Sequence, residues 1–195
     1  MKTVPTILGA AAIALLAQSH AQAANLTIVN APAINCVFDA TCRVVVHDDL
    51  GSLTYAPGTS GPRLQSRTFV AKPGTPGAGK TAYIYRVDLS EAGGITDCVA
   101  GVVINFGPVA TLPYLPNQPA HVYVITQGGI GSVGVKSAVQ TGDVIEFGFS
   151  TLLCPGQSSF FFGLAAAKPP MSSNATVFAI GNPPIVQTKA DVPQH

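Results

Sequence analysis

Apolar residues recur at every second position along most of the chain from Leu26 onward, and this spacing limits the fold more than any other feature. The segment 142–149 is the clearest case, because Ile145, Phe147 and Phe149 alternate with residues that are smaller or more polar. No stretch of a dozen residues keeps a helical stripe free of glycine and proline. The sequence therefore predicts a domain built mainly of β-strands.

A second strand is expected over 81–89, with Tyr83 and Tyr85 in the core and Ile84, Arg86 and Asp88 facing water. Further strands are expected at 26–30, 42–47, 67–71, 98–106, 121–126, 158–165, 175–180 and 185–188. The segments 98–106 and 158–165 are apolar on both faces, which is typical of central strands covered on each side. About ten short strands with turns between them predict an all-β, single-domain β-sandwich, either jelly-roll or immunoglobulin-like. The proline- and glycine-rich stretches 57–62 and 72–79 are expected to be exposed loops.

The first 23 residues have the order of a signal peptide. Lys2 precedes an apolar run over 7–17, and Ala21 and Ala23 supply the small residues of a cleavage site. The run is too short to span a bilayer of about 30 Å. We expect cleavage after Ala23 and a secreted domain of residues 24–195, periplasmic or extracellular, with no transmembrane segment.

Four cysteines in an exported chain favour disulfide bonds over a metal site, because no C-x-x-C pair is present. Three connectivities are possible. We expect Cys36 to pair with Cys42 across a short loop and Cys98 to pair with Cys154 across a long one, giving two disulfides.

The domain predicted to remain after cleavage is formally neutral. The ten lysines and arginines include Lys2, so nine basic and nine acidic residues follow residue 23. Charged residues make up 10% of the chain, against about 25% in typical proteins. This composition offers no electrostatic basis for binding nucleic acid, and weak charge repulsion favours self-association.

Two glycine-rich stretches match nucleotide-binding patterns without their structural context. Residues 74–81 satisfy G-x-x-x-x-G-K-[ST], but an alternating strand follows where a phosphate loop needs a helix. Residues 129–134 satisfy G-x-G-x-x-G, but only residues 135–141 separate them from the next strand, too few for a crossover helix. We therefore expect no nucleotide site, and interpret the second stretch as a turn followed by a short irregular strand.

His47, Asp48 and Asp49 form the best polar cluster, where the 42–47 strand is expected to end in a turn containing Gly51. Their imidazole and carboxylate groups could hold a cation such as calcium. Aspartates in turns also commonly bond to their own backbone. His121 begins an alternating strand and is expected to be a half-buried or an edge histidine.

Carbohydrate chemistry has few candidate residues in this sequence. Glu91 and Glu146 cannot be matched to a second carboxylate by spacing, and Glu146 is expected on the solvated face of its strand. The chain has no tryptophan, so the candidate sugar platforms are Tyr55, Tyr114 and one of Tyr83 and Tyr85, although these last two share a strand face and are expected in the core.

Taken together, these features favour a secreted, non-enzymatic protein of structural, adhesive or matrix-associated type. An open edge strand near 185–188 would let its sheet pair with another copy. The alternative is a carbohydrate-binding module, or a small polysaccharide-active enzyme, that contacts a cell-surface glycan and could hold calcium near Asp48 and Asp49. The stretches 122–134 and 159–170 resemble parts of secreted bacterial proteins, and the resemblance implies a β-sandwich exported by a bacterium.

Overall fold

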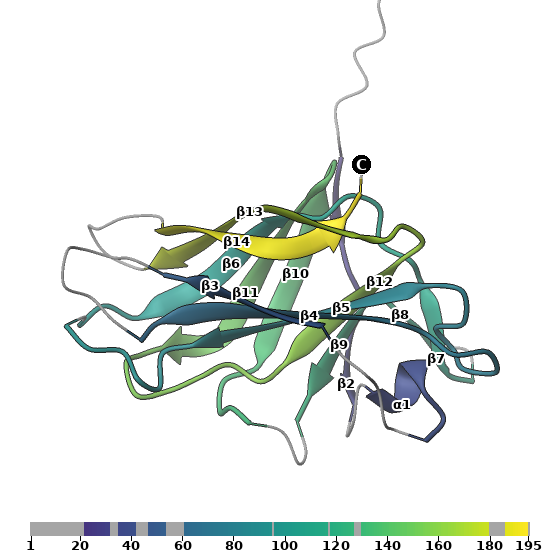
Figure 1. The fold of residues 1–195 in the computed structure, drawn as a ribbon, viewed down its shortest axis with the longest axis horizontal. Helices are drawn as coiled ribbons and strands as arrows, with labels where there is room; N and C mark the ends of the chain where they lie inside the picture. Colours follow the sequence, from purple (N-terminus) through teal and green to yellow (C-terminus); the bar gives the residue numbers. More distant parts are fainter. Residues whose placement is uncertain are drawn as a thin grey trace, which may run out of the picture.

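A computed structural model describes residues 22–31, 35–41, 47–53, 61–94, 96–116, 118–126, 130–179 and 186–194. The described chain is nearly all β, with one four-residue helix, α1 (Asn35–Phe38). Two six-stranded sheets pack face to face as a β-sandwich (Figure 1). The predicted all-β sandwich is therefore confirmed at this level, and the jelly-roll and immunoglobulin-like alternatives both stay open.

The first sheet, called sheet A, is antiparallel throughout. In spatial order its strands are β1 (Ala23–Asn25), β10 (Val135–Thr141), β11 (Val144–Leu153), β6 (Val99–Asn105), β13 (Pro170–Ala179) and β14 (Val186–Pro193). The last strand extends to Pro193, and Ala190 and Val192 alternate into the core.

The second sheet, sheet B, is antiparallel except where β2 runs parallel to β9. In spatial order its strands are β2 (Ile28–Ala31), β9 (Val122–Ile125), β12 (Phe162–Ala166), β5 (Thr81–Asp88), β4 (Arg63–Val70) and β3 (His47–Ser52). A separate hairpin is formed by β7 (Leu112–Leu115) and β8 (Gln118–Ala120).

The main core lies between the two sheets. Phe147 of sheet A meets Phe162 of sheet B with ring centroids 4.9 Å apart. Ile145, Phe147 and Phe149 are all buried, as the alternation predicts. Tyr83 and Tyr85 are fully buried, as predicted, and their hydroxyls donate to the carbonyls of Lys168 and Asp191.

A second apolar cluster covers much of the outer face of sheet B. It joins Phe38 of α1 and Leu112 of the β7–β8 hairpin to Ile84 and Tyr123 of the sheet. On the same face Arg86 and Asp88 are each only 8% exposed. The expectation that Ile84, Arg86 and Asp88 face water is therefore wrong, because segments remote in sequence cover this side of β5.

The outer face of sheet A lacks such a cover in the described part of the chain. Val103 of β6 is half-exposed, and Val144 of β11 is 41% exposed. The expectation that residues 98–106 form a strand covered on both faces is wrong, although β6 does lie centrally between β11 and β13. For 158–165 the expectation is confirmed over β12, which is buried throughout.

Different segments connect the two sheets at the two lateral edges of the sandwich. On one side the N-terminal segment pairs with sheet A through β1, crosses at Thr27, and pairs with sheet B through β2. On the other side β14 lies against β3 and β4, where the Thr188 hydroxyl donates to the Ser52 carbonyl at 3.0 Å. Thr188 is buried, so the β14 edge packs against sheet B at this residue.

The disulfide between Cys98 and Cys154 is present and joins the start of β6 to the end of β11. Cys36 is also disulfide-bonded. Its expected partner, Cys42, lies outside the described residues, so the Cys36–Cys42 pair stays a prediction.

The expected signal peptide falls almost entirely on residues 1–21, which lie outside the described residues. The expected cleavage point lies within β1, because Ala23 pairs with Thr141 and Ala24 with Gln140. In the described part of the chain, no helix has the length and apolar content needed to cross a membrane.

Candidate functional site

His47, Asp48 and Asp49 lie in an edge strand and not in a turn. They open β3, which continues through Gly51 to Ser52, and they pair with Thr68, Arg67 and Ser66 in that order. The expected turn at Gly51 is therefore wrong. The side chains of these three residues are outside what the structure describes, and the calcium site there stays a prediction. Elsewhere among the described residues, no three His, Cys, Asp or Glu side chains gather to hold a metal.

His121 is half-buried, as predicted, and is hydrogen-bonded to Thr27, where the N-terminal segment crosses from sheet A to sheet B. The Thr27 amide donates to Nδ1 at 3.1 Å, so this nitrogen carries no proton. Nε2 therefore carries the proton of the neutral ring and donates to the Thr111 hydroxyl at 2.8 Å. Desolvation by burial lowers the pKa of His121. This histidine is thus neutral and positioned by two hydrogen bonds.

The glycine-rich loop 71–80, which carries the phosphate-loop pattern, packs against α1. The Gly77 amide donates to the Val37 carbonyl at 3.1 Å, and a Cβ at Gly77 would lie 2.3 Å from the Phe38 ring. Thr75 is buried and donates to the Lys72 carbonyl at 2.7 Å. As predicted, strand β5 follows this loop. The loop is therefore mostly exposed, as predicted, with Thr75 and Gly77 buried, and Gly77 allows the close approach to Phe38.

The dinucleotide pattern at 129–134 leads into β10, where the register shifts between Val135 and Ser137. The short irregular strand expected there is confirmed in this form. Residues 127–129 lie outside the described residues.

An ionic cluster lies at one end of sheet B, with Arg86 and Asp88 buried and Glu91 exposed. Asp88 contacts Arg86 and Arg63, and Arg63 reaches Glu91 at 2.9 Å. The Arg86 guanidinium also lies 5.5 Å from the ring centroid of Phe161. These groups neutralise one another, so the cluster contributes to stability and presents little net charge.

The described chain leaves the outer face of sheet A uncovered. The strand registers place its residues in rows that run across β10, β11, β6, β13 and β14. We call this surface the open face, and define it by Ser137, Val139, Val144, Glu146, Gly148, Gly101, Val103, Asn105, Asn174, Thr176, Phe178, Gln187 and Lys189. Its side chains are mainly amides, hydroxyls and small apolar groups.

A shallow hollow of about 250 Å³ lies on the open face, lined by Val103, Glu146, Thr176 and Phe178. Glu146, Val103 and Thr176 are direct neighbours across β11, β6 and β13. Glu146 is exposed, as predicted, whereas Thr176 and Phe178 are half-exposed. The hollow therefore combines a carboxylate, a hydroxyl and an aromatic ring on three rigid strands.

Two paired glycines form the neighbouring row. Gly148 and Gly101 are direct partners, and Phe178 lies opposite Gly101 on its other side. A Cβ at Gly101 would lie 2.6 Å from Cζ of Phe178 and 2.1 Å from the Phe147 carbonyl oxygen. Since glycine leaves this space empty, the Phe178 ring leans over the sheet beside the hollow.

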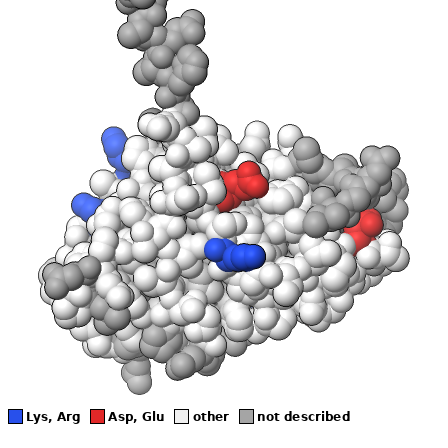
Figure 2. Space-filling model, turned by 180° about the vertical axis from the view of Figure 1, so that it is seen from behind, with Lys and Arg blue, Asp and Glu red and all other residues white. Residues whose placement is uncertain are grey.

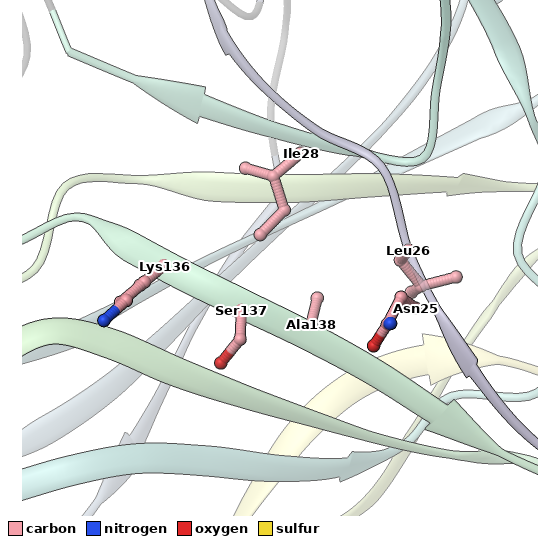
Figure 3. A pocket seen from close by; sticks show the side chains of 6 residues that line it. All are labelled: Asn25, Leu26, Ile28, Lys136, Ser137 and Ala138. Atoms are coloured by element: carbon pink, nitrogen blue, oxygen red, sulfur yellow. The ribbon is translucent and has the colours of Figure 1, made fainter.

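A second hollow, of about 240 Å³, lies where the N-terminal segment leaves sheet A. Figure 3 shows Asn25, Leu26 and Ile28 of that segment on one side and Lys136, Ser137 and Ala138 of β10 on the other. The Leu26 amide donates to the Ala138 carbonyl at 2.9 Å, the last such bond before the segment crosses to sheet B.

The molecule carries little charge on the side seen in Figure 2, where isolated acidic and basic groups stand in an otherwise uncharged surface. On the open face itself, the charged residues are Glu146 and Lys189. The Lys189 ammonium donates to the Asn174 side-chain oxygen at 2.7 Å.

Sequence reasoning identified Glu146 as solvent-facing but missed Thr176, Phe178 and Val103. The alternation in 175–180 could have placed Thr176 and Phe178 on one face, but the sequence does not say which face is covered. Of the candidate tyrosines, Tyr114 is half-exposed and donates to the Asn30 carbonyl, and Tyr55 lies outside the described residues.

Comparison with protein-family models, with curated proteins and with solved structures found no match to this chain.

Proposed function

We propose that this chain is the precursor of a secreted, non-enzymatic β-sandwich protein of adhesive or matrix-associated type, with the open face as its binding surface. The observation that carries the proposal is the difference between the two outer faces. α1, the 71–80 loop and the β7–β8 hairpin cover much of sheet B, while the described chain leaves sheet A uncovered.

The chemistry of the open face supports a binding role. Side chains on neighbouring strands keep fixed positions, since the strands are held by backbone hydrogen bonds and by the core beneath them. Strands lie about 4.8 Å apart, so the row from Val139 to Gln187 extends about 19 Å across five strands. A surface of this length suits a polymer better than a small molecule.

The first experiment tests whether the open face mediates attachment. Asn105→Arg and Gln187→Arg place large charged side chains on exposed positions of the face, outside the hollow. Binding of the mature protein to insoluble extracellular material from the producing cells would be measured by co-sedimentation. We expect each variant to bind about tenfold more weakly than wild type, equivalent to about 1.4 kcal/mol.

The matched control is Val70→Arg, at a position on β4 that is 72% exposed and lies on the other sheet. This variant should bind like wild type. Wild-type protein that does not co-sediment, or open-face variants that bind as well as Val70→Arg, would contradict the proposed function.

A further inference from the structure

We infer that the hollow formed by Val103, Glu146, Thr176 and Phe178 is a subsite for one sugar ring of a neutral polysaccharide. This inference rests on the proposed function, because it names the ligand of the open face. It depends on which groups meet in the hollow and on the weak charge around them.

The aromatic ring supplies the apolar half of the site. Phe178 is half-exposed and leans over Gly101, so part of its ring faces solvent beside the hollow. Pyranose rings have an apolar side made of C–H groups, which packs against an aromatic ring. Val103 lies between Glu146 and Thr176 and widens the apolar floor.

Polar groups on both sides of Val103 supply the other half. The Glu146 carboxylate accepts hydrogen bonds, and neighbouring hydroxyls of a sugar can donate to both of its oxygens. The Thr176 hydroxyl, two strands away, both donates and accepts. A ring that packs on Phe178 can therefore place its hydroxyls between these groups.

Charge selects a neutral polymer over an anionic one. Glu146 would repel a sugar carboxylate or sulfate in the same hollow. Lys189, on the same face, donates a hydrogen bond from its ammonium to the Asn174 side-chain oxygen at 2.7 Å. Because the row through the hollow crosses five strands, further rings of an extended chain can contact Val139 on one side and Gln187 on the other.

The test is affinity electrophoresis of the mature protein in gels that contain laminarin, xyloglucan, galactomannan or alginate. We expect at least one of the three neutral polysaccharides to retard the wild-type protein and the anionic alginate to leave its mobility unchanged. Phe178→Ala should weaken the retardation about fivefold, since it removes the ring on which the sugar stacks. Phe178→Tyr, which keeps the ring, should bind like wild type.

Glu146→Gln and Thr176→Val test the polar half, and both positions are solvent-accessible. Each variant should weaken binding several-fold. Met171→Ala is the control: it changes an exposed residue of β13, the strand that carries Thr176, but lies outside the hollow and should leave binding unchanged. Thermal unfolding of every variant would check that the fold is kept. If Phe178→Ala does not fold, the Glu146→Gln result decides.

Absence of retardation by every neutral polysaccharide would overturn the subsite, as would equal retardation of Glu146→Gln, Phe178→Ala and wild type. Retardation by alginate alone would also overturn it. The proposed function fails separately, because it is judged by co-sedimentation of Asn105→Arg and Gln187→Arg. An open face that attaches to extracellular material but binds none of the neutral polysaccharides would leave the proposed function standing and remove the sugar subsite.

Discussion

Asp88 is a buried carboxylate whose ionised form holds two arginines together. It contacts Arg86 and lies 4.0 Å from Nε of Arg63, while Ser90 donates to Oδ1 from its hydroxyl at 2.6 Å and its amide at 3.0 Å. Desolvation by burial acts to raise the pKa of Asp88, but these hydrogen bonds and the two guanidinium charges outweigh it. The net result is a pKa below the ordinary value of 3.8.

Asp88→Asn should lower the free energy of unfolding by about 3 kcal/mol at neutral pH, because it leaves the Arg86 charge buried without its partner. A lowered folded-state pKa means that the stabilisation by ionised Asp88 is present above about pH 3.9 and is lost as the pH falls through the folded value. Urea unfolding curves of wild type and variant should therefore differ at neutral pH and converge in strong acid. Asp143→Asn, an exposed change, should match wild type within about 0.5 kcal/mol, and an Asp88→Asn curve equal to it would refute this role.

At the scale of elements, the N-terminal strand depends on His121 for its crossing between sheets. Neutral His121 accepts a hydrogen bond from the Thr27 amide at Nδ1, and a ring protonated on both nitrogens cannot do so. Since burial lowers the folded-state pKa, the stabilisation is complete above the unfolded value of about 6.5 and decreases as the pH falls through it.

Hydrogen exchange of the Thr27 amide, corrected for intrinsic rates, should therefore accelerate as the pH falls below about 6.5. His121→Gln is the matched variant, because its amide can accept from Thr27 and donate to Thr111 without titrating. Its corrected exchange rate should stay constant over the same range. Parallel pH profiles in the two proteins would show that His121 does not control this strand.

The strands themselves could be predicted from the sequence where alternation is strict. Residues 142–149 and 81–89 form β11 and β5 with the expected residues inward, because a period of two allows few alternatives. The strand that follows the phosphate-loop pattern could likewise be predicted, since the residues after Lys80 alternate and form β5. Local pattern was sufficient in these cases.

What covers each sheet could not be predicted, since it depends on segments far apart in sequence. Arg86 and Asp88 look like solvent-facing residues, yet Phe161 and a partner from β4 bury them. Val103 looks like a covered residue and is half-exposed. Phe38 belongs to a four-residue helix with too little periodicity to be recognised. The candidate site was missed for the same reason, because its residues come from three non-consecutive strands.

At the scale of the whole molecule, the accessibility of the edge strands determines whether two copies can pair through their sheets. β14 packs against β3 and β4, so that edge offers little room for a further strand. The free stretch of β10 beyond Leu26 carries a register shift and the exposed side chain of Lys136. Irregular pairing and an exposed lysine are the features by which edge strands avoid pairing with other chains.

We therefore expect the mature protein to sediment as one monomeric species over a wide concentration range, despite a composition whose weak charge favours association. Lys136→Val removes the charge from the irregular stretch of β10 and should introduce a concentration-dependent larger species, because an apolar edge is a better template for strand pairing. Lys168→Val, an exposed change outside the strands of both sheets, is the matched loss of one lysine and should stay monomeric. A wild-type dimer at micromolar concentration would mean that one of these edges is accessible to a second copy. Association of both variants would show that net charge, and not protection of the β10 edge, keeps the copies apart.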